Sequence, residues 1–331
     1  MDLSELRDEL KKDTEIIVSS EFNVEVRDTA FVPTLETEGI TYPNLDEKSM
    51  KAKQIKTCVL FIDMRKSTDL NLKHKPETLT KLYGAFMRSM VKAAQHFGGE
   101  VRNIIGDRIM VVFNEKNSCR NALNTAALLN SVGMNVIYHY FEHNDIEFGI
   151  GVDFGRMLVS KGGIIKNGDK NAPYKSLVWL GKPANIASKL TDLANKYSES
   201  LHFSLENKLL LVSSNDHDQT TKTVSYKDLV SEEFEKGTDV QIIEDEDIGK
   251  WYLVYGEITK GYFPMINLST NKGSYKKTPK ILVTEKVLQE LKDKNFEYYE
   301  KFEEIWKPQN SLLFPDHNIF GSNLEYALFK E

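Results

Sequence analysis

Two apolar runs joined by only two residues constrain the fold of this chain more than any other feature. Residues 100–105 are EVRNII, residues 108–113 are RIMVVF, and Gly106 and Asp107 connect them. A Gly-Asp pair between apolar strands is a strong signal for an antiparallel hairpin, because both residue types suit tight turns. The chain is therefore expected to contain this hairpin in an antiparallel sheet, with Asp107 at its tip.

The segments around the hairpin predict an alternation of strands and helices. Helix 77–97 is expected because its apolar residues recur on one helical face, and Gly98 and Gly99 follow it as stop signals. The other expected elements are a strand at 56–63, helix 118–130, a hairpin within 147–163, strand 176–181 and helix 183–196. This order predicts an α+β fold of the ferredoxin-like kind, an antiparallel sheet with helices on one face.

Changes in composition along the chain suggest four parts. The expected boundaries are 1–54 for an N-terminal helix and extended lead-in, 55–196 for the catalytic core, 197–278 for an insertion and 279–331 for the completion of the core fold. The insertion is polar and irregular but holds apolar pieces at 208–213 and 250–258, so we expect it to be ordered. A final strand is expected at 324–329.

The overall composition excludes several classes of protein. Charged residues make up 28% of the chain and the net charge is −6, so we expect no nucleic-acid partner. The longest apolar runs are strand-sized, which argues against a membrane span, and the N-terminus lacks the features of a secretion signal. Two cysteines are too few for a disulfide framework or a zinc site. We expect a cytoplasmic protein.

A strand that ends on a carboxylate points to the chemistry. Asp63 ends the run LFID, and the cations Arg65 and Lys66 follow it closely. A strand-end Asp often caps a turn, but it can also bind a metal ion in a phosphate site. In a ferredoxin-like sheet the end of this strand can approach Asp107 on the hairpin. Because two close carboxylates repel unless a cation lies between them, the pair favours a metal site.

Four motifs together resemble the class III nucleotidyl cyclase domain. They are FIDMRKST at 61–68, GGEVRNIIGDRIMVVF at 98–113, GIGVDFGRMLVS at 149–160 and LGKPANIASKL at 180–190, in the order and spacing of that family. The resemblance covers about 55–196 and returns at 279–330. It implies a ferredoxin-like sheet and a head-to-tail homodimer whose active sites lie across the interface.

The resemblance also implies roles for individual residues. Asp63 and Asp107 would hold two divalent cations, magnesium or manganese, with Ile62 contributing to the same metal site. Asn185 and Lys189 would come from the partner chain as catalytic residues. Asn185 would orient the ribose, and Lys189 would neutralise charge that builds up on the α-phosphate.

Several positions depart from the family pattern, and they bear on the substrate. Lys189 stands where the family has Arg, and it remains a cation without the planar fork of Arg. Asn103 and Val178 stand where adenylyl and guanylyl cyclases carry the residues that recognise the purine. Val178 has no polar group, whereas Asn103 can both donate and accept a hydrogen bond. Arg108 and Met64 complete the expected substrate-binding set.

A cyclase that keeps its metal carboxylates and lacks the purine-recognition residues resembles the bacterial Pycsar pyrimidine cyclases. That resemblance implies a cytidylate or uridylate cyclase, acting in anti-phage defence through a separate effector protein. Arg108 and the lead-in near Tyr42 are expected to narrow the pocket against purines. Asn103 could pair with cytosine or uracil, so the base stays open, with a slight preference for CTP. The alternatives are an adenylyl cyclase with unusual base contacts and a non-catalytic nucleotide-binding domain.

Overall fold

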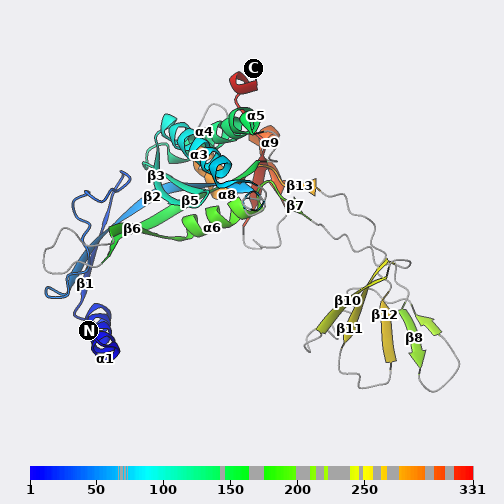
Figure 1. Ribbon diagram of the computed structural model, residues 1–331, viewed down its shortest axis with the longest axis horizontal. Helices are drawn as coiled ribbons and strands as arrows, with labels where there is room; N and C mark the ends of the chain where they lie inside the picture. Colours follow the sequence, from blue (N-terminus) through cyan, green and yellow to red (C-terminus); the bar gives the residue numbers. More distant parts are fainter. Residues whose placement is uncertain are drawn as a thin grey trace. The chain divides into compact units, whose positions relative to one another are not determined.

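A computed structural model describes most of the chain. The described residues are 1–65, 67, 70, 72, 74–141, 146–163, 175–198, 276–294, 302–309 and 317–330, together with the backbone of five short strands between 209 and 266. The chain divides into two compact units, one made of Met1–Lys196 with Thr278–Glu331 and the other of Tyr197–Lys277 (Figure 1). Each unit is described by itself below.

The first unit is built on a nine-stranded sheet. Its strand order is β15-β16-β14-β5-β2-β4-β3, with β1 beside β2 and β6 beside β5. The strands are β1 (Asn23–Asp28), β2 (Ser49–Arg65), β3 (Gly99–Ile105), β4 (Arg108–Phe113), β5 (Glu147–Gly163), β6 (Lys175–Leu180), β14 (Ile281–Thr284), β15 (Lys307–Gln309) and β16 (Ile319–Ser322). The four strands β5-β2-β4-β3 pair antiparallel in the ferredoxin-like order, which confirms the predicted fold class. The sheet is mixed, however, because β1 with β2 and β14 with β5 pair in parallel.

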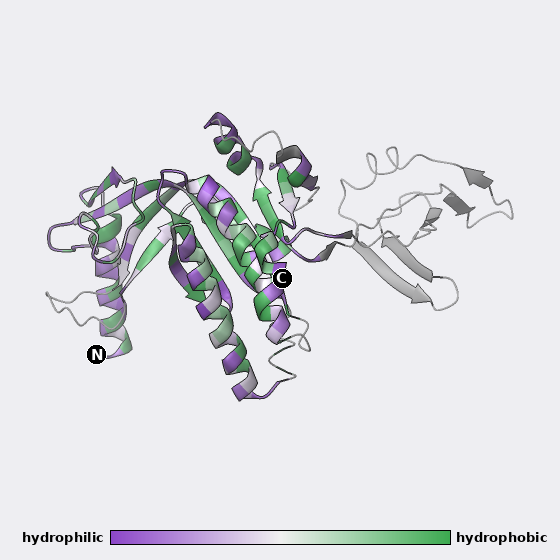
Figure 2. Cartoon of the chain, turned by 90° about the horizontal axis from the view of Figure 1, so that it is seen from above, coloured by the Kyte–Doolittle hydropathy of each residue, from purple (hydrophilic) through white to green (hydrophobic). Residues whose placement is uncertain are grey.

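Helices cover both faces of this sheet (Figure 1). The helical segments of the first unit are α1 (Leu3–Val18), α3 (Pro76–His96), α4 (Ser118–Val132), the π-helix Gly133–Ile137, α5 (Tyr138–Tyr140), α6 (Lys182–Leu193), α8 (Glu285–Asp293), α9 (Phe302–Ile305) and the 3₁₀ turn Ala327–Lys330. Apolar side chains of α3, α4 and α8 form one large core with the sheet, while α6 packs against the opposite face. Figure 2 shows that these helices carry both hydrophilic and hydrophobic residues, as expected of amphipathic helices. The expectation that all helices share one face is therefore wrong for α6.

The strands β2 and β5 are each 17 residues long and pair along most of their length. The ladder runs from Lys53 opposite Val159 to Arg65 opposite Glu147. The hairpin expected within 147–163 is therefore one continuous strand. The glycine at 155 does not make a turn; instead it leaves room for Pro183 of α6, since a Cβ atom there would lie 2.9 Å from the proline ring.

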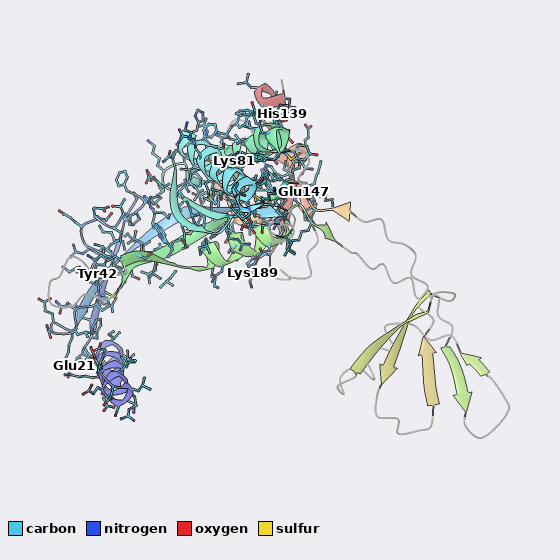
Figure 3. All side chains as sticks on the ribbon, viewed as in Figure 1. Glu21, Tyr42, Lys81, His139, Glu147 and Lys189 are labelled. Atoms are coloured by element: carbon cyan, nitrogen blue, oxygen red, sulfur yellow. The ribbon has the colours of Figure 1, made fainter. Side chains whose placement is uncertain are left out.

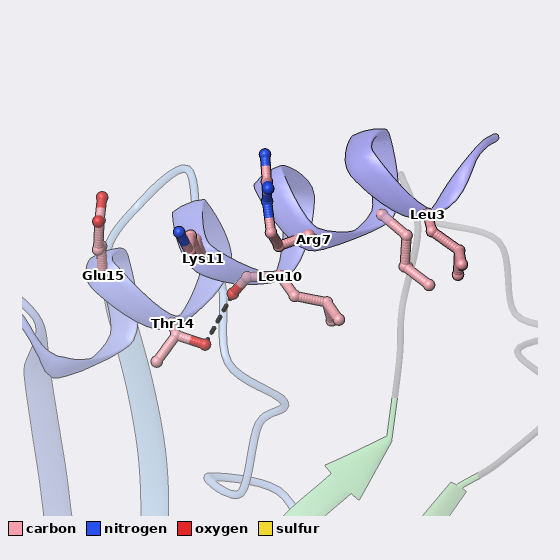
Figure 4. A pocket seen from close by; sticks show the side chains of 7 residues that line it. Leu3, Arg7, Leu10, Lys11, Thr14 and Glu15 are labelled. Atoms are coloured by element: carbon pink, nitrogen blue, oxygen red, sulfur yellow. Dashed lines mark hydrogen bonds between the residues drawn. The ribbon is translucent and has the colours of Figure 1, made fainter.

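Helix α1 stands largely free of the core (Figure 1). It begins at a capping box formed by Asp2 and Glu5, and none of its residues is buried. Figure 4 shows a hollow along this helix, lined by Leu3, Leu6, Arg7, Leu10, Lys11, Thr14 and Glu15. No candidate active-site residue lines that hollow. Among the described residues, none of the helices has the length and apolar composition needed to span a membrane.

The unit Tyr197–Lys277 contains only strands in its described part. They are β7 (Tyr197–Ser198), β8 (Leu209–Ser213), β9 (Thr220–Lys222), β10 (Asp239–Asp245), β11 (Gly249–Tyr255), β12 (Tyr262–Ile266) and β13 (Lys276–Lys277). Two of them, β8 and β11, overlap the apolar pieces expected to be β-structure. The strand expected at 324–329 is not formed. The last described strand is β16, which ends at Ser322, and a 3₁₀ turn follows at Ala327–Lys330.

Candidate active site

The backbone register brings Asp63 and Asp107 to the same edge of the sheet. The ladder between β2 and β4 ends where Ile62 pairs with Ile109, so Asp63 is the next residue of β2 beyond it. Asp107 lies in the turn before β4, two residues from Ile109. The turn forms because Gly106 adopts a positive φ of 60°, which glycine tolerates without strain. The hairpin and the first core strand therefore meet as the sequence predicted.

The carboxylate of Asp107 lacks a hydrogen-bond partner on one of its two oxygen atoms among the described residues. That atom, Oδ2, is buried. Burial and then repulsion from Asp63 raise the pKa of Asp107, and hydrogen bonds from its own backbone and from Ser67 only partly offset them. A carboxylate held in this way beside a second one suits a site for a cation.

Arg108 follows Asp107 and binds residues from two elements. Its Nη2 donates to Asp63 Oδ2 at 2.7 Å and also to Asp192 Oδ1, while its Nη1 donates to Ser188 Oγ at 2.8 Å. Burial disfavours the charged guanidinium, but the hydrogen bonds to the two carboxylates outweigh burial and raise the pKa of Arg108. Arg108 therefore ties β4 to β2 and to α6 within one chain.

Arg65 has a structural role instead of facing a substrate. Its side chain is buried, and Nε and Nη2 both donate to the carbonyl oxygen of Ala194, at 2.9 and 2.6 Å. Gly149 opposite makes room for it, since a Cβ atom there would lie 1.8 Å from Arg65 Nη2. Arg65 Nη1 is 3.9 Å from Asp63 Oδ2, so it adds positive charge behind that carboxylate. Lys66 lies outside the described residues.

Asn185 and Lys189 lie on the exposed side of α6. They are four residues apart, so they share one helical face. Both side chains are exposed, and neither makes a hydrogen bond or ion pair with any residue that the structure describes. Within one chain they are not in hydrogen-bond contact with Asp63 or Asp107. Figure 3 labels Lys189 on the outer side of its helix.

The remaining candidate residues lie at several places. The side chains of Ile62 and Met64 are buried in the main core, so only their backbone atoms are available to a metal ion or a substrate. Asn103 is exposed at a bulge in β3, and its register partner Met110 pairs with Phe61 of β2.

Val178 is at the far end of the long β5 strand. It lies on β6 and pairs with Ser160 of β5. The next residue of β5, Val159, pairs with Lys53 of β2, and Lys53 lies eight residues before Phe61, the residue of β2 at the level of Asn103. The register therefore does not place Asn103 and Val178 side by side in one chain.

Tyr42 lies next to β5 and β6, far from Arg108. The ammonium of Lys161 is 5.8 Å from the centre of the Tyr42 ring, and Lys161 pairs with Leu177, the neighbour of Val178. Thr41 is hydrogen-bonded to Lys51, twelve residues before Asp63, and twelve extended residues span about 40 Å. Arg108 and Tyr42 of the same chain therefore do not line one pocket, and the expected narrowing stays a prediction for a pair of chains.

The sequence-based prediction missed two residues of this site, Ser188 and Asp192. They share the inward side of α6 toward Arg108, and their spacing of four residues is the available signal. That signal is weak, because the spacing shows only that the two residues share a helix face and does not show that Arg108 lies against that face.

Comparison with known proteins identifies the family. The model of the adenylate and guanylate cyclase catalytic domain matches residues 49–226, more than half of the chain. The chain belongs to this cyclase family. A uridylate cyclase from Burkholderia cepacia is 29% identical over 52% of this chain and 72% of its own length. A cytidylate cyclase from Staphylococcus aureus is 31% identical over 32% of this chain and 28% of its own length. The structure of an adenylyl cyclase from P. aeruginosa aligns at 16% identity with a TM-score of 0.39, covering 67% of this chain and 99% of that chain.

The cyclase family uses divalent cations, and the residues of this chain fit one. The orphaned buried Oδ2 of Asp107 and the neighbouring carboxylate of Asp63 supply the hard oxygen donors that magnesium and manganese prefer. Within the part of the chain that the structure describes, no cluster of three or more His, Cys, Asp or Glu side chains is arranged to hold a metal.

Proposed function

We propose that this cyclase converts CTP or UTP to the 3′,5′-cyclic monophosphate and pyrophosphate. The observation that carries the proposal is that Asp63 and Asp107 are kept together while the base-recognition positions hold Asn103 and Val178. Curated relatives that act on pyrimidine nucleotides support the same substrate class.

Asp63 and Asp107 are the residues that would hold the two divalent cations. Bound there, the cations would lower the pKa of the ribose 3′-hydroxyl and neutralise the leaving pyrophosphate. In the reaction the 3′-oxygen bonds to the α-phosphorus, the bond from that phosphorus to the β-phosphate oxygen breaks, and the hydroxyl proton passes to solvent. The buried carboxylate of Asp107 is prepared for this role, because it has no competing partner on Oδ2 among the described residues.

Asn185 and Lys189 would act on the site of a second copy of the chain in a head-to-tail homodimer. Their exposure on α6 supports this, since neither binds a described residue of its own chain. The amide of Asn185 would hold the ribose. The ammonium of Lys189 would stabilise negative charge on the α-phosphate in the transition state.

The base would be selected by Asn103 on β3 of one chain and by the region around Val178 on β6 of its partner in the homodimer. The amide of Asn103 presents one donor and one acceptor, so it can pair with the edge of cytosine or of uracil. Val178 is 37% exposed and offers only apolar contact. Tyr42, close to this strand, supplies an aromatic ring in the same region. CTP is favoured slightly over UTP.

The cyclic product would serve as a second messenger in anti-phage defence. We propose that the enzyme acts in the cytoplasm and that its product binds a separate effector protein. This part of the proposal is supported by the resemblance to the Pycsar cyclases.

Incubating the purified protein with each of the four nucleoside triphosphates and Mn²⁺, at equal concentrations, tests this function. Chromatography with mass spectrometry against cyclic nucleotide standards should show cyclic CMP or cyclic UMP as the main product. Asp63→Asn, which keeps the shape of the side chain, should lower turnover at least about a hundredfold, since it removes a ligand for charge stabilisation. Turnover of ATP as fast as that of CTP and UTP would establish an adenylyl cyclase instead. The absence of any cyclic product would support a non-catalytic domain.

A further inference from the structure

A guanidinium nitrogen of Arg108 lies between the carboxylate of Asp63, at the candidate metal site, and the carboxylate of Asp192 on α6. Nη2 of Arg108 donates to Asp63 Oδ2 at 2.7 Å and to Asp192 Oδ1, so it bridges β2 and α6. The Asp63 side chain is 14% exposed and that of Asp192 is 49% exposed. In the free chain, therefore, the more buried carboxylate already has a cation.

A metal ion at Asp63 must compete with this guanidinium. Charge-assisted hydrogen bonds are about twice as strong as neutral ones, so breaking the contact between Arg108 and Asp63 opposes metal binding. The other two partners of Arg108, Asp192 and Ser188, both lie on α6 and do not depend on Asp63. They can keep Arg108 charged and paired after Asp63 is released.

We propose that Asp192 is a positioning residue of this cyclase: with Ser188, it retains Arg108 on α6 and so frees Asp63 for the metal ion. The inference rests on the proposed function, because it takes Asp63 as a metal ligand. It assigns a role to a residue outside the four motifs, and it makes Arg108 a competitor of the metal in the free enzyme.

Two opposite effects on metal affinity follow. Arg108→Gln removes the competitor, so Mn²⁺ should bind about tenfold more tightly, as expected for one charge-assisted contact. Asp192→Asn leaves Arg108 with Asp63 as its only carboxylate partner among the described residues, so Mn²⁺ should bind about three- to tenfold more weakly. Ser188→Ala removes a neutral partner without a change of charge and should weaken binding in the same direction, by a smaller factor.

The experiment is a Mn²⁺ titration of the full chain without nucleotide, followed by the electron paramagnetic resonance signal of free Mn²⁺. The single variants are compared with wild type and with the double variant Arg108→Gln, Asp192→Asn. Asp293→Asn on α8 is the matched control, because this exposed carboxylate contacts Gln289. Lys189→Gln tests the effect of losing a different cation, one that lies on the exposed side of α6. Circular dichroism of each variant checks that the fold is kept.

The double variant separates positioning from general electrostatics. If Asp192 acts through Arg108, Asp192→Asn weakens Mn²⁺ binding in wild type and has little effect in the Arg108→Gln background. An equal effect in both backgrounds would overturn the proposal, as would Lys189→Gln tightening binding as much as Arg108→Gln. Absence of Mn²⁺ binding in all variants, Arg108→Gln included, would overturn it too. Cyclisation of CTP or UTP by wild type, measured separately, shows whether the proposed function itself fails.

Discussion

Asp107 combines burial with proximity to a like charge, and both disfavour its ionised form. The raised pKa of Asp107 has burial as its main cause and repulsion from Asp63 as the second. The folded chain therefore holds a proton on Asp107 up to a higher pH than the unfolded chain does. Ionisation of Asp107 in the metal-free protein accordingly lowers stability, whereas a bound cation reverses that effect.

Asp107→Asn should stabilise the metal-free protein at pH 7. The free energy of unfolding of wild type falls as the pH rises from the usual carboxyl range through the raised pKa of Asp107. The variant does not lose stability in this way, because its amide at position 107 stays neutral at every pH. We expect the melting temperature in chelator to rise by a few degrees, since about 1 kcal/mol shifts it by about 2–4 °C in a domain of this size. The gain should disappear at acidic pH, below the usual carboxyl range. Added Mn²⁺ should raise the melting temperature of wild type more than that of the variant.

Thermal unfolding from pH 4 to pH 8, with and without Mn²⁺, measures these effects. The exposed Asp46→Asn serves as the control for charge removal. A variant less stable than wild type at pH 7 in chelator would show that the Asp107 carboxylate makes a favourable contact in the free protein.

Single residues show which parts of the site were predictable. Asp63 and Asp107 follow from local motifs, because a strand end and a hairpin tip are defined by neighbouring residues. Arg65 follows Asp63 closely in the sequence, yet its partner is the carbonyl of Ala194, 129 positions away in the chain. No local pattern indicates which of the cations near Asp63 is committed to the fold and which faces the site.

At the scale of elements, alternate glycines on β5 determine where α6 lies. Gly149, Gly151 and Gly155 share one face of the strand, since side chains alternate along it. A Cβ atom at Gly151 would lie 2.2 Å from the carbonyl oxygen of Ala187 and 2.4 Å from the amide nitrogen of Thr191. The backbone of α6 therefore rests directly on β5 and places its residues at the site.

Gly151→Ala should destabilise the protein by about 1–3 kcal/mol or more, because the added methyl group meets backbone atoms that cannot rotate away. Gly84→Ala is the matched control. Gly84 lies within α3, and an added Cβ atom there meets nothing within 4 Å. That substitution should instead stabilise by about 0.5–1 kcal/mol through helix propensity. Urea denaturation of both variants makes the comparison, and equal stability of Gly151→Ala and wild type would contradict direct packing of α6 on β5.

Element types were easier to predict than their neighbours. Helix α3 was expected at 77–97 and spans Pro76–His96, because its apolar periodicity is local. The glycines of β5 suggested a turn, whereas the structure uses them for close packing of a helix. Glycine satisfies both needs, so its purpose is decided by what lies across from it.

At the scale of the whole molecule, one chain does not assemble all the candidate groups. Asn185 and Lys189 are exposed and contact no described polar partner in their own chain. Tyr42 lies beside the start of β2, and the twelve residues of β2 from Lys51 to Asp63 span about 40 Å. In the head-to-tail homodimer that we propose, the two groups of residues would come together from different chains.

Mixing two inactive variants tests this arrangement. Asp63→Asn and Asn185→Ala should each lose activity alone, while their mixture regains about a quarter of wild-type activity, because half of the dimers carry one intact site. Subunit exchange is confirmed beforehand with differently tagged chains. Two mixtures should stay inactive, Asp63→Asn with Asp107→Asn and Asn185→Ala with Lys189→Ala, since each removes residues from the same half of the site. Failure of the first mixture despite exchange would contradict a shared site.

The sequence by itself determined the hairpin, the long helix, the family motifs and the pairing of two carboxylates. These depend on local turn chemistry, on helical or strand periodicity and on the spacing of a few residues. The tertiary structure alone decided that α6 crosses the opposite face of the sheet, that Arg65 is committed to Ala194 and that Arg108 bridges Asp63 and Asp192. The physical reason is that a charged or small side chain is compatible with many local patterns, and its role depends on the groups that folding brings within a few ångströms of it.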